Sequence, residues 1–326
     1  MDHTTGLLLP IAAVIAGFLM LVWGADRFVV GAAATARNLG ISTLIIGLTV
    51  VGFGTSAPEM LVSGMAAWQG NTGLSIGNAL GSNIANIGLI LGVTALIAPL
   101  DVHSDTLRRE FPILLAVVMF AGVLMADGNL GRIDGLLLLG GLCMMLYWLV
   151  TLGMRMRRGD PMTREITAEV PEARPLSRAL MWLVFGLAVL LVSSRMLVWG
   201  AVEIAQSLGV SDLVIGLTIV AIGTSLPELA AAIVSAIKKE HDIAIGNIIG
   251  SNMFNLLAVL PLPGLISPGR FPEEVLVRDL PVMAIMTLAL FAMAYGFGGH
   301  GRINRLEGGT LLAAFVGYQV MLYIQH

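Results

Sequence analysis

The chain has 326 residues, of which 57% are hydrophobic and only 12% are charged, and its mean hydropathy is +0.89. A soluble domain usually carries about 25% charged residues, so this composition excludes an ordinary soluble protein and predicts a polytopic membrane protein whose surroundings are a lipid bilayer. The net charge of −3 and the lack of a basic tract exclude a nucleic-acid partner. The single Cys143 excludes an intramolecular disulfide, and its apolar neighbours predict a small core residue.

Ten stretches are long and apolar enough to cross a bilayer, which takes about 20 predominantly apolar residues. They are residues 7–35, 42–68, 73–98, 106–126, 132–153, 179–206, 211–237, 242–266, 275–298 and 303–324. The first stretch follows no basic region and has no evident small-residue cleavage site, so we expect a first span and not a signal peptide. The predicted fold is all-α, with ten transmembrane helices.

A polar segment rich in charge and proline divides the chain into two halves of five spans each. The expected divisions are a first five-helix repeat at 1–153, a linker at 154–178 and a second five-helix repeat at 179–326. A shift of 169 residues aligns 31–86 with 200–255 without a gap, and about 25 of those 56 positions are identical. Because five is odd, the second half must enter the membrane from the opposite side, which makes the repeat inverted.

Basic residues gather in the linker and in the loops after spans 3, 7 and 9, which all lie on one side of a ten-span arrangement. The positive-inside rule therefore places the linker in the cytoplasm and both termini outside. Two arginines, Arg27 and Arg195, fall within or near spans 1 and 6. We expect them to snorkel to the interface or to pair with Asp26 or Glu203; a charge partner for a transport path is the alternative.

Two copies of one polar motif interrupt apolar runs, GLTVVGFGTSAPE ending at Glu59 and GLTIVAIGTSLPE ending at Glu228. A carboxylate inside a membrane costs a few kcal/mol and is by default a functional-site candidate. In a helix, Thr55 and Ser56 share a face with Glu59. Pro58 removes a backbone donor and crowds the carbonyl four residues earlier, so the helix loosens and frees carbonyls nearby. The second copy repeats this arrangement with Thr224, Ser225, Pro227 and Glu228.

A second polar segment follows in the next span of each half, GNALGSNIAN at 77–86 and GNIIGSNMFN at 246–255. Its Ser and Asn, Ser82 with Asn86 and Ser251 with Asn255, are four residues apart and present a hydroxyl and an amide oxygen on one helical face. Hard cations such as Ca²⁺, Mg²⁺ and Na⁺ take oxygen ligands, whereas zinc and copper usually recruit nitrogen or sulfur. All five His fall in loops or termini. Two carboxylates would neutralise one divalent ion.

Helix packing is the alternative role for small residues in a span, because they let two helices approach closely. Each Ser, Thr or Gly taken singly fits that alternative, and we assign the Gly pairs of 77–81 and 246–250 to packing. Glu59 and Glu228 do not fit it, since each follows a Pro and recurs at the same offset.

GTSAPE with GSNIAN, and GTSLPE with GSNMFN, resemble the α-1 and α-2 repeats of the calcium/cation antiporter superfamily, the sodium/calcium exchangers, and the ten-span form is similar to the bacterial inner-membrane calcium/sodium antiporters. The resemblance covers essentially the whole chain. It implies no enzyme and no cofactor, but a secondary antiporter that exchanges Ca²⁺ for Na⁺ across the bacterial inner membrane by alternating access, with spans 1 and 6 sliding over the core. No obligatory protein partner is inferred. The implied ligands are the carbonyls of Gly52 and Ala221 and the side chains of Thr55, Ser56, Glu59, Ser82, Asn86, Thr224, Ser225, Glu228, Ser251 and Asn255.

The motifs also bear on the coupling ion. The cation/proton branch of the superfamily carries a GNxxE-type motif where this chain has GTSxPE, which favours sodium coupling. Potassium-dependent members typically have Asp at the position of Asn255, so potassium co-transport is disfavoured. A Ca²⁺/H⁺ or other divalent cation/H⁺ antiporter and, with less support, a cation channel remain open. A hydrolase is disfavoured, because no His or Lys lies in a span to activate Ser56 or Ser225.

Overall fold

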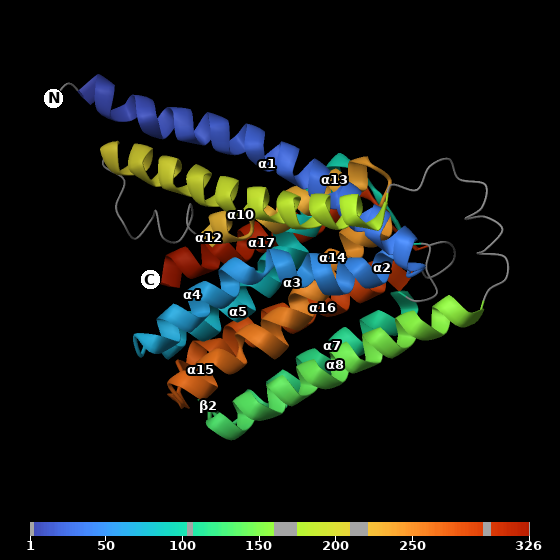
Figure 1. The fold of residues 1–326 in the computed structure, drawn as a ribbon. Helices are drawn as coiled ribbons and strands as arrows, with labels where there is room; N and C mark the ends of the chain where they lie inside the picture. The colour runs from blue at the N-terminus through green and yellow to red at the C-terminus, as the bar shows by residue number, and fades with distance from the viewer. Residues whose placement is uncertain (1–2, 103–106, 160–174, 209–220, 296–300, 326) are drawn as a thin grey trace.

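The computed structural model describes residues 3–102, 107–159, 175–208, 221–295 and 301–325. They form a helical fold with four short strands (Figure 1). The first half contains α1 (His3–Leu39), α2 (Thr43–Ile46), η1 (Gly47–Val51), α3 (Gly52–Thr55), α4 (Ala57–Trp68), α5 (Thr72–Ala85), η2 (Asn86–Leu91), α6 (Gly92–Ile97), β1 (Leu100–Val102), α7 (Leu107–Met125), β2 (Asn129–Leu130) and α8 (Arg132–Gly159). The second half contains α10 (Leu176–Ser207), α12 (Ala221–Thr224), α13 (Leu226–Ile237), α14 (His241–Phe254), η4 (Asn255–Val259), α15 (Pro261–Ile266), β3 (Gly269–Arg270), η5 (Val275–Asp279), α16 (Leu280–Tyr295), β4 (Gly301–Ile303) and α17 (Arg305–Gln325). Elements labelled η are π-helical turns.

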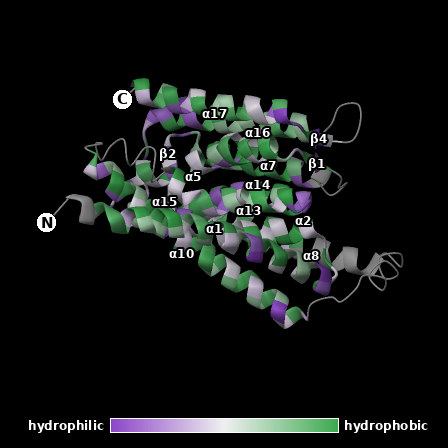
Figure 2. Ribbon diagram, turned by 90° about the horizontal axis from the view of Figure 1, so that it is seen from above, coloured by the Kyte–Doolittle hydropathy of each residue, from purple (hydrophilic) through white to green (hydrophobic). Residues whose placement is uncertain are grey.

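Apolar helices of membrane-spanning length make up much of the fold. Within the described residues, six helices are long and apolar enough to cross a bilayer, or seven when the bent pair Thr43–Thr55 and Ala57–Trp68 counts as one span. Green predominates along the long helices in Figure 2, in keeping with this composition. The predicted all-α membrane fold is confirmed, and the described helices begin and end within a few residues of the predicted spans. The count of ten spans stays a prediction, because residues 209–220, which open the seventh, lie outside the described residues.

The proline-containing motif breaks its span as the sequence predicts. Ser56 has φ −79° and ψ 5°, which interrupts the helix between α3 and α4, and the two parts bend by 44°. Ser225 has φ −89° and ψ 4° and separates α12 from α13 in the same way. In both copies the proline then occupies the first turn of the new helix, where its missing N–H costs nothing.

Helices α1 and α10 form a closely packed pair that lies side by side along one edge of the molecule (Figure 1). A Cβ built on Gly31 would lie 2.8 Å from the Cα of Leu183, and one built on Gly186 would lie 2.7 Å from the Cα of Phe28. Only glycine allows the two backbones to approach this closely. The pair is therefore a single unit packed against the rest of the fold.

Helix α14 is the most enclosed element, and every residue of its span Ile243–Phe254 is buried. A Cβ on Gly246 would lie 2.7 Å from the carbonyl oxygen of Leu44, so α14 crosses α2 and η1 in backbone contact. The predicted packing role of this Gly pair is confirmed. At Gly77 and Gly81, the equivalent positions, an added Cβ would meet no described atom within 4 Å.

Four short strands, which the sequence does not predict, tie the halves together. β1 pairs with β4, joining Asp101 to Arg302, and β2 pairs with β3, joining Asn129 to Arg270. Each sheet thus takes one strand from each half. In Figure 2 β2 lies at one end of the molecule and the β1–β4 sheet lies at the other. β2 and β4 follow equivalent spans of the two halves, and inverted repeats place such equivalent loops at opposite ends.

The two ends of the described chain lie at one side of the molecule, and the helix ends that flank the expected linker lie at the other. The start of α1 and the end of α17 lie at the left of Figures 1 and 2, whereas the end of α8 and the start of α10 lie at the right of Figure 1. Helix α8 continues to Gly159 and α10 begins at Leu176, so helix extends into both ends of the expected linker. Cys143 is exposed on α8, so its predicted core position is wrong: the apolar face that carries it points outward.

Candidate cation-binding site

Helices from both halves converge around the two predicted carboxylates. Glu59 lies in the first turn of α4, which packs on α5, and Glu228 lies in the first turn of α13, which packs on α14. The four helices meet because α14 also packs against α3 and α5. Each carboxylate therefore lies at the start of a helix, where the first backbone N–H groups have no intrahelical partner.

The two carboxylates are almost completely enclosed. Glu59 is 1% exposed and Glu228 is 2% exposed. No described residue donates a hydrogen bond to Oε2 of either side chain, and no described Lys or Arg forms an ion pair with them. A buried charge without a partner is unfavourable by several kcal/mol. A bound cation would satisfy both oxygens at once.

Hydroxyl groups of the two motifs reach across the boundary between the halves. The Ser56 hydroxyl donates to Glu228 Oε1 over 3.4 Å, and the Ser251 hydroxyl donates to the Gly52 carbonyl over 3.4 Å. Both bonds are long, so they are weak and easily exchanged for a contact with a cation. Ser56, Glu228, Ser251 and Gly52 were all predicted as ligands, and the structure brings them together.

The remaining predicted ligands lie beside α13 or on elements that pack against α4 or α13. Thr55, Ser82, Asn86, Ser225 and Asn255 are buried, and no described residue donates to Asn255 Oδ1. Thr224 is half-buried. Ala221 begins α12.

Four asparagines that the sequence reasoning passed over hold the site together. Asn78 donates to the carbonyl of Glu59 over 3.1 Å, and its repeat mate Asn247 donates to the carbonyl of Glu228 over 3.4 Å and accepts from Thr55 over 3.1 Å. The Asn83 amide donates to the carbonyl of Asn252 over 3.2 Å. The signal was present, because these residues are identical at the offset of 169, and Asn78 and Asn247 lie four residues before Ser82 and Ser251 on the same helical face.

Both predicted Asn ligands open a π-helical turn. Asn86 begins η2 and Asn255 begins η4. The wider turn leaves some backbone groups outside the regular helical ladder, and such turns are frequent at functional sites. The Asn86 amide donates to Asn252 Oδ1 over 3.0 Å, which fixes one of the two side chains. No residue pattern in the sequence predicts this change from α-helix to π-helix.

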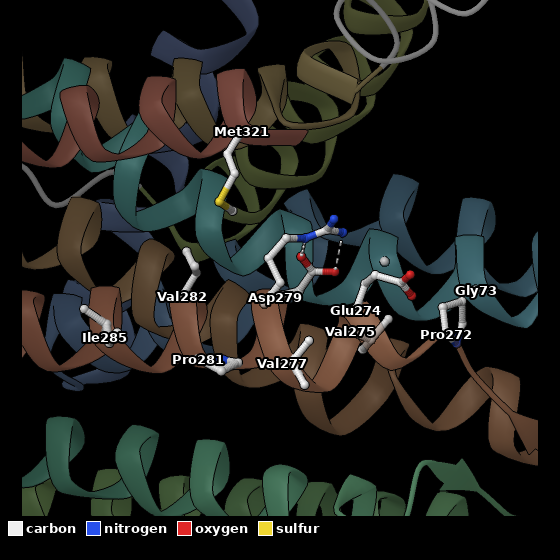
Figure 3. A pocket seen from close by; sticks show the side chains of 12 residues that line it. Gly73, Pro272, Glu274, Val275, Val277, Asp279, Pro281, Val282, Ile285 and Met321 are labelled. Atoms are coloured by element: carbon white, nitrogen blue, oxygen red, sulfur yellow. Dashed lines mark hydrogen bonds and ion pairs between the residues drawn. The ribbon is translucent and has the colours of Figure 1, made fainter. Parts of the chain in front are cut away.

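A pocket of about 1010 Å³, which neither carboxylate lines, lies between α5 and the η5–α16 segment (Figure 3). Its polar lining is Glu274 and the adjacent pair Arg278 and Asp279, where Nε of the arginine is 2.6 Å from Oδ1 of the acid. Asp279 also accepts from the Tyr318 hydroxyl over 2.9 Å. Its charge is therefore already partnered, unlike that of Glu59 and Glu228.

No group of three or more His, Cys, Asp and Glu side chains that could hold a metal ion occurs among the described residues. The site is instead assembled from two carboxylates together with hydroxyl, amide and carbonyl oxygens. This composition suits a hard cation that is bound and released, because few charged ligands bind less tightly than a full carboxylate cage.

The comparison with known proteins agrees with this geometry. Residues 9–151 and 178–324 match the family described as "Sodium/calcium exchanger protein". The chain belongs to the sodium/calcium exchanger family. As a member it is a membrane transporter and not an enzyme, and the activity common to this family is cation antiport.

Relatives match nearly the full length. The "Putative antiporter CaxA" of Alkalimonas amylolytica is 52% identical over 95% of this chain and 97% of its own, and the "Inner membrane protein YrbG" of Escherichia coli is 44% identical over 97% and 98%. The "Sodium/calcium exchanger MaX1" of Methanosarcina acetivorans is 33% identical over 94% and 96%. A solved structure of the sodium-calcium exchanger NCX_Mj, soaked with zero Na⁺ and Ca²⁺, has a TM-score of 0.83, 34% identity and coverage of 97% and 99%.

Proposed function

We propose that this exchanger moves Ca²⁺ in one direction and Na⁺ in the other through a shared site between Glu59 and Glu228. The observation that carries the proposal is that each inverted half contributes one buried carboxylate whose Oε2 has no described donor. Two negative charges match one divalent cation. The sodium part is supported by the GTSxPE motifs and by two relatives, MaX1 and NCX_Mj, that are described as sodium/calcium exchangers.

The proposed ligands are the oxygens grouped around these carboxylates. They are the carbonyls of Gly52 and Ala221 and the side chains of Thr55, Ser56, Glu59, Ser82, Asn86, Thr224, Ser225, Glu228, Ser251 and Asn255. The cross-half contact between Ser56 and Glu228 supports the assignment, since it places two residues that are 172 positions apart, one from each motif, within hydrogen-bond distance. Na⁺ and Ca²⁺ then compete because neither can be held without the same carboxylates.

Alternating access would follow from the way the α1–α10 pair is built. Its two helices are locked together at Gly31 and Gly186, so they move as one body across the helices that carry the ligands. The sliding motion exposes the site to one side of the membrane at a time. The proposed halves, 1–153 and 179–326, joined by a cytoplasmic linker at 154–178, are supported by the separate matches of the family over 9–151 and 178–324. Both termini then lie on the periplasmic side of the inner membrane.

The test is flux into proteoliposomes that contain the purified chain. Radioactive Ca²⁺ uptake should follow an outward Na⁺ gradient and be absent under a pH gradient alone. Glu59→Gln and Glu228→Gln should each abolish uptake, since the remaining single charge cannot hold a divalent ion. Glu203→Gln, an exposed carboxylate on α10, is the matched control and should transport normally.

A binding measurement separates loss of the site from loss of the fold. Ca²⁺ should raise the unfolding temperature of the wild type, because a ligand that binds only the folded state stabilises it. The same addition should leave the unfolding temperature of Glu59→Gln and Glu228→Gln unchanged. Uptake driven only by the pH gradient would overturn sodium coupling, single-channel conductance would overturn antiport, and wild-type uptake by either variant would overturn the site.

A further inference from the structure

A small cavity of about 160 Å³ adjoins the site on the α10 side. Its lining comes from three helices and includes Pro58 of α4, Thr224 of α12 and Arg195 of α10. Pro58 precedes Glu59, and Thr224 belongs to the proposed ligands. The cavity therefore ends at the wall of the cation site, and its volume is enough for several water molecules.

Helices α10 and α12 pack closely against each other beside the cavity. The Ser194 hydroxyl donates to the carbonyl of Gly223 over 2.9 Å, and Ser194 is only 5% exposed. A Cβ on Gly223 would collide with Val198, so α10 and α12 are in close contact there. Arg195 follows Ser194 directly and lines the same cavity, so the position of its backbone relative to the site is set by this contact.

The charge of Arg195 is not neutralised within the described part of the chain. The arginine forms no ion pair with any described carboxylate, and the expected pairing with Glu203 is not made. The other lining side chains are mostly apolar, among them Leu61, Val62, Leu191 and Val198. An exposed positive charge with no described ion-pair partner thus lies beside a site for cations.

The equivalent position in the first half carries the opposite charge. A shift of 169 places Arg195 on Asp26, which forms an ion pair of 2.7 Å with Lys238 and one of 3.8 Å with Arg27. Among the described residues, a positive charge without an ion-pair partner beside the site is therefore a feature of α10 and not of both halves.

From this arrangement we infer that Arg195 is a specificity-determining residue, whose charge lowers the affinity of the site for Ca²⁺ more than for Na⁺. The electrostatic free energy of an ion in the field of Arg195 is proportional to the ion's charge. The penalty on Ca²⁺ is therefore twice the penalty on each Na⁺. This inference rests on the proposed shared site.

The test is equilibrium binding to the full chain in lipid nanodiscs, where both faces are open to solvent. Dissociation constants for Ca²⁺ and for Na⁺ are measured separately at constant ionic strength. In Arg195→Gln the Ca²⁺ constant should fall by the square of the factor for Na⁺, for example about ninefold against about threefold. Arg195→Lys retains the charge and should keep both constants near the wild-type values.

Arg178→Gln is the matched control, because Arg178 is also exposed on α10 but lies about 25 Å away along the helix. That distance exceeds the screening length of about 8 Å in physiological salt, so neither constant should change. If Arg195→Gln does not fold, Arg195→Leu removes the charge with a side chain suited to lipid.

Equal factors for the two ions, or no change in either, would overturn the role of Arg195. These outcomes are distinct from failure of the proposed function, which flux in proteoliposomes reports independently.

Discussion

Replacing Gly250 by alanine should damage the cation site through the backbone, without touching a ligand side chain. Gly250 lies where α14 crosses η1, and an added Cβ would lie 2.8 Å from the Cα of Leu48 and closer still to its carbonyl oxygen. An ordinary contact needs at least 3.4 Å, and neither partner is a flexible side chain. The two helices must therefore separate by roughly half an ångström or more.

Separation of α14 from η1 would directly alter the arrangement of ligands in the cation site. The next residue, Ser251, donates to the Gly52 carbonyl over 3.4 Å, which is already near the limit of a hydrogen bond. Overpacking of this kind costs about 1–3 kcal/mol. If most of that cost falls on the ligand arrangement, Ca²⁺ affinity drops by about tenfold or more.

The assay combines thermal unfolding in detergent with the Ca²⁺ dissociation constant. Gly64→Ala on α4 is the matched control, since its Cβ would lie 3.9 Å from Leu262, an ordinary contact. This control should be as stable as the wild type or more so, because alanine favours helix by about 1 kcal/mol over glycine. Wild-type stability and affinity in Gly250→Ala, or equal damage from Gly64→Ala, would refute the reasoning.

Three further experiments test contacts elsewhere in the fold. Asn247→Ala removes the amide that links α13 to α3 and should weaken Ca²⁺ binding about tenfold, which calorimetry would measure; unchanged binding would contradict its positioning role. Tyr318→Phe leaves Asp279 without its hydroxyl donor and should lower the unfolding free energy by about 1–2 kcal/mol while transport persists. A double-mutant cycle on Asp26 and Lys238 should give a coupling of only about 0.5 kcal/mol, because both side chains are partly exposed; a value of several kcal/mol would mean a buried pair.

Much of the fold was predictable, because the membrane imposes strong rules on the chain. Apolar stretches of about 20 residues become helices in a bilayer, where backbone groups must be satisfied internally. The break at Ser56 was equally predictable, since Pro58 removes a backbone donor in any surroundings. The strands β1 to β4 were not, because pairs such as Asp101 with Arg302 form only after distant loops meet.

The site likewise contains residues that the sequence predicts and residues whose roles depend on tertiary packing. Glu59 and Glu228 could be selected from the sequence, since a carboxylate within a span is costly and two at one offset are not accidental. The role of Asn247 could not, because its partners, Thr55 in the other half and the carbonyl of Glu228, are fixed only by how α14 crosses its neighbours. The environment of Arg195 was likewise open, since its exposure and its place in the cavity lining depend on packing between α10 and α12.

The sequence by itself determined that the chain is a helical membrane protein of two related halves, with a carboxylate and a proline break in each. Hydropathy and proline geometry act within a single span, and the repeat is visible in the sequence alone. None of these properties therefore depends on tertiary contacts. Only the tertiary structure decided that Ser56 lies against Glu228, that Ser251 lies against Gly52, and that Arg195 lines the neighbouring cavity. The contact of Ser251 with Gly52 depends on the close backbone crossings at Gly246 and Gly250, which bring together residues about 200 positions apart.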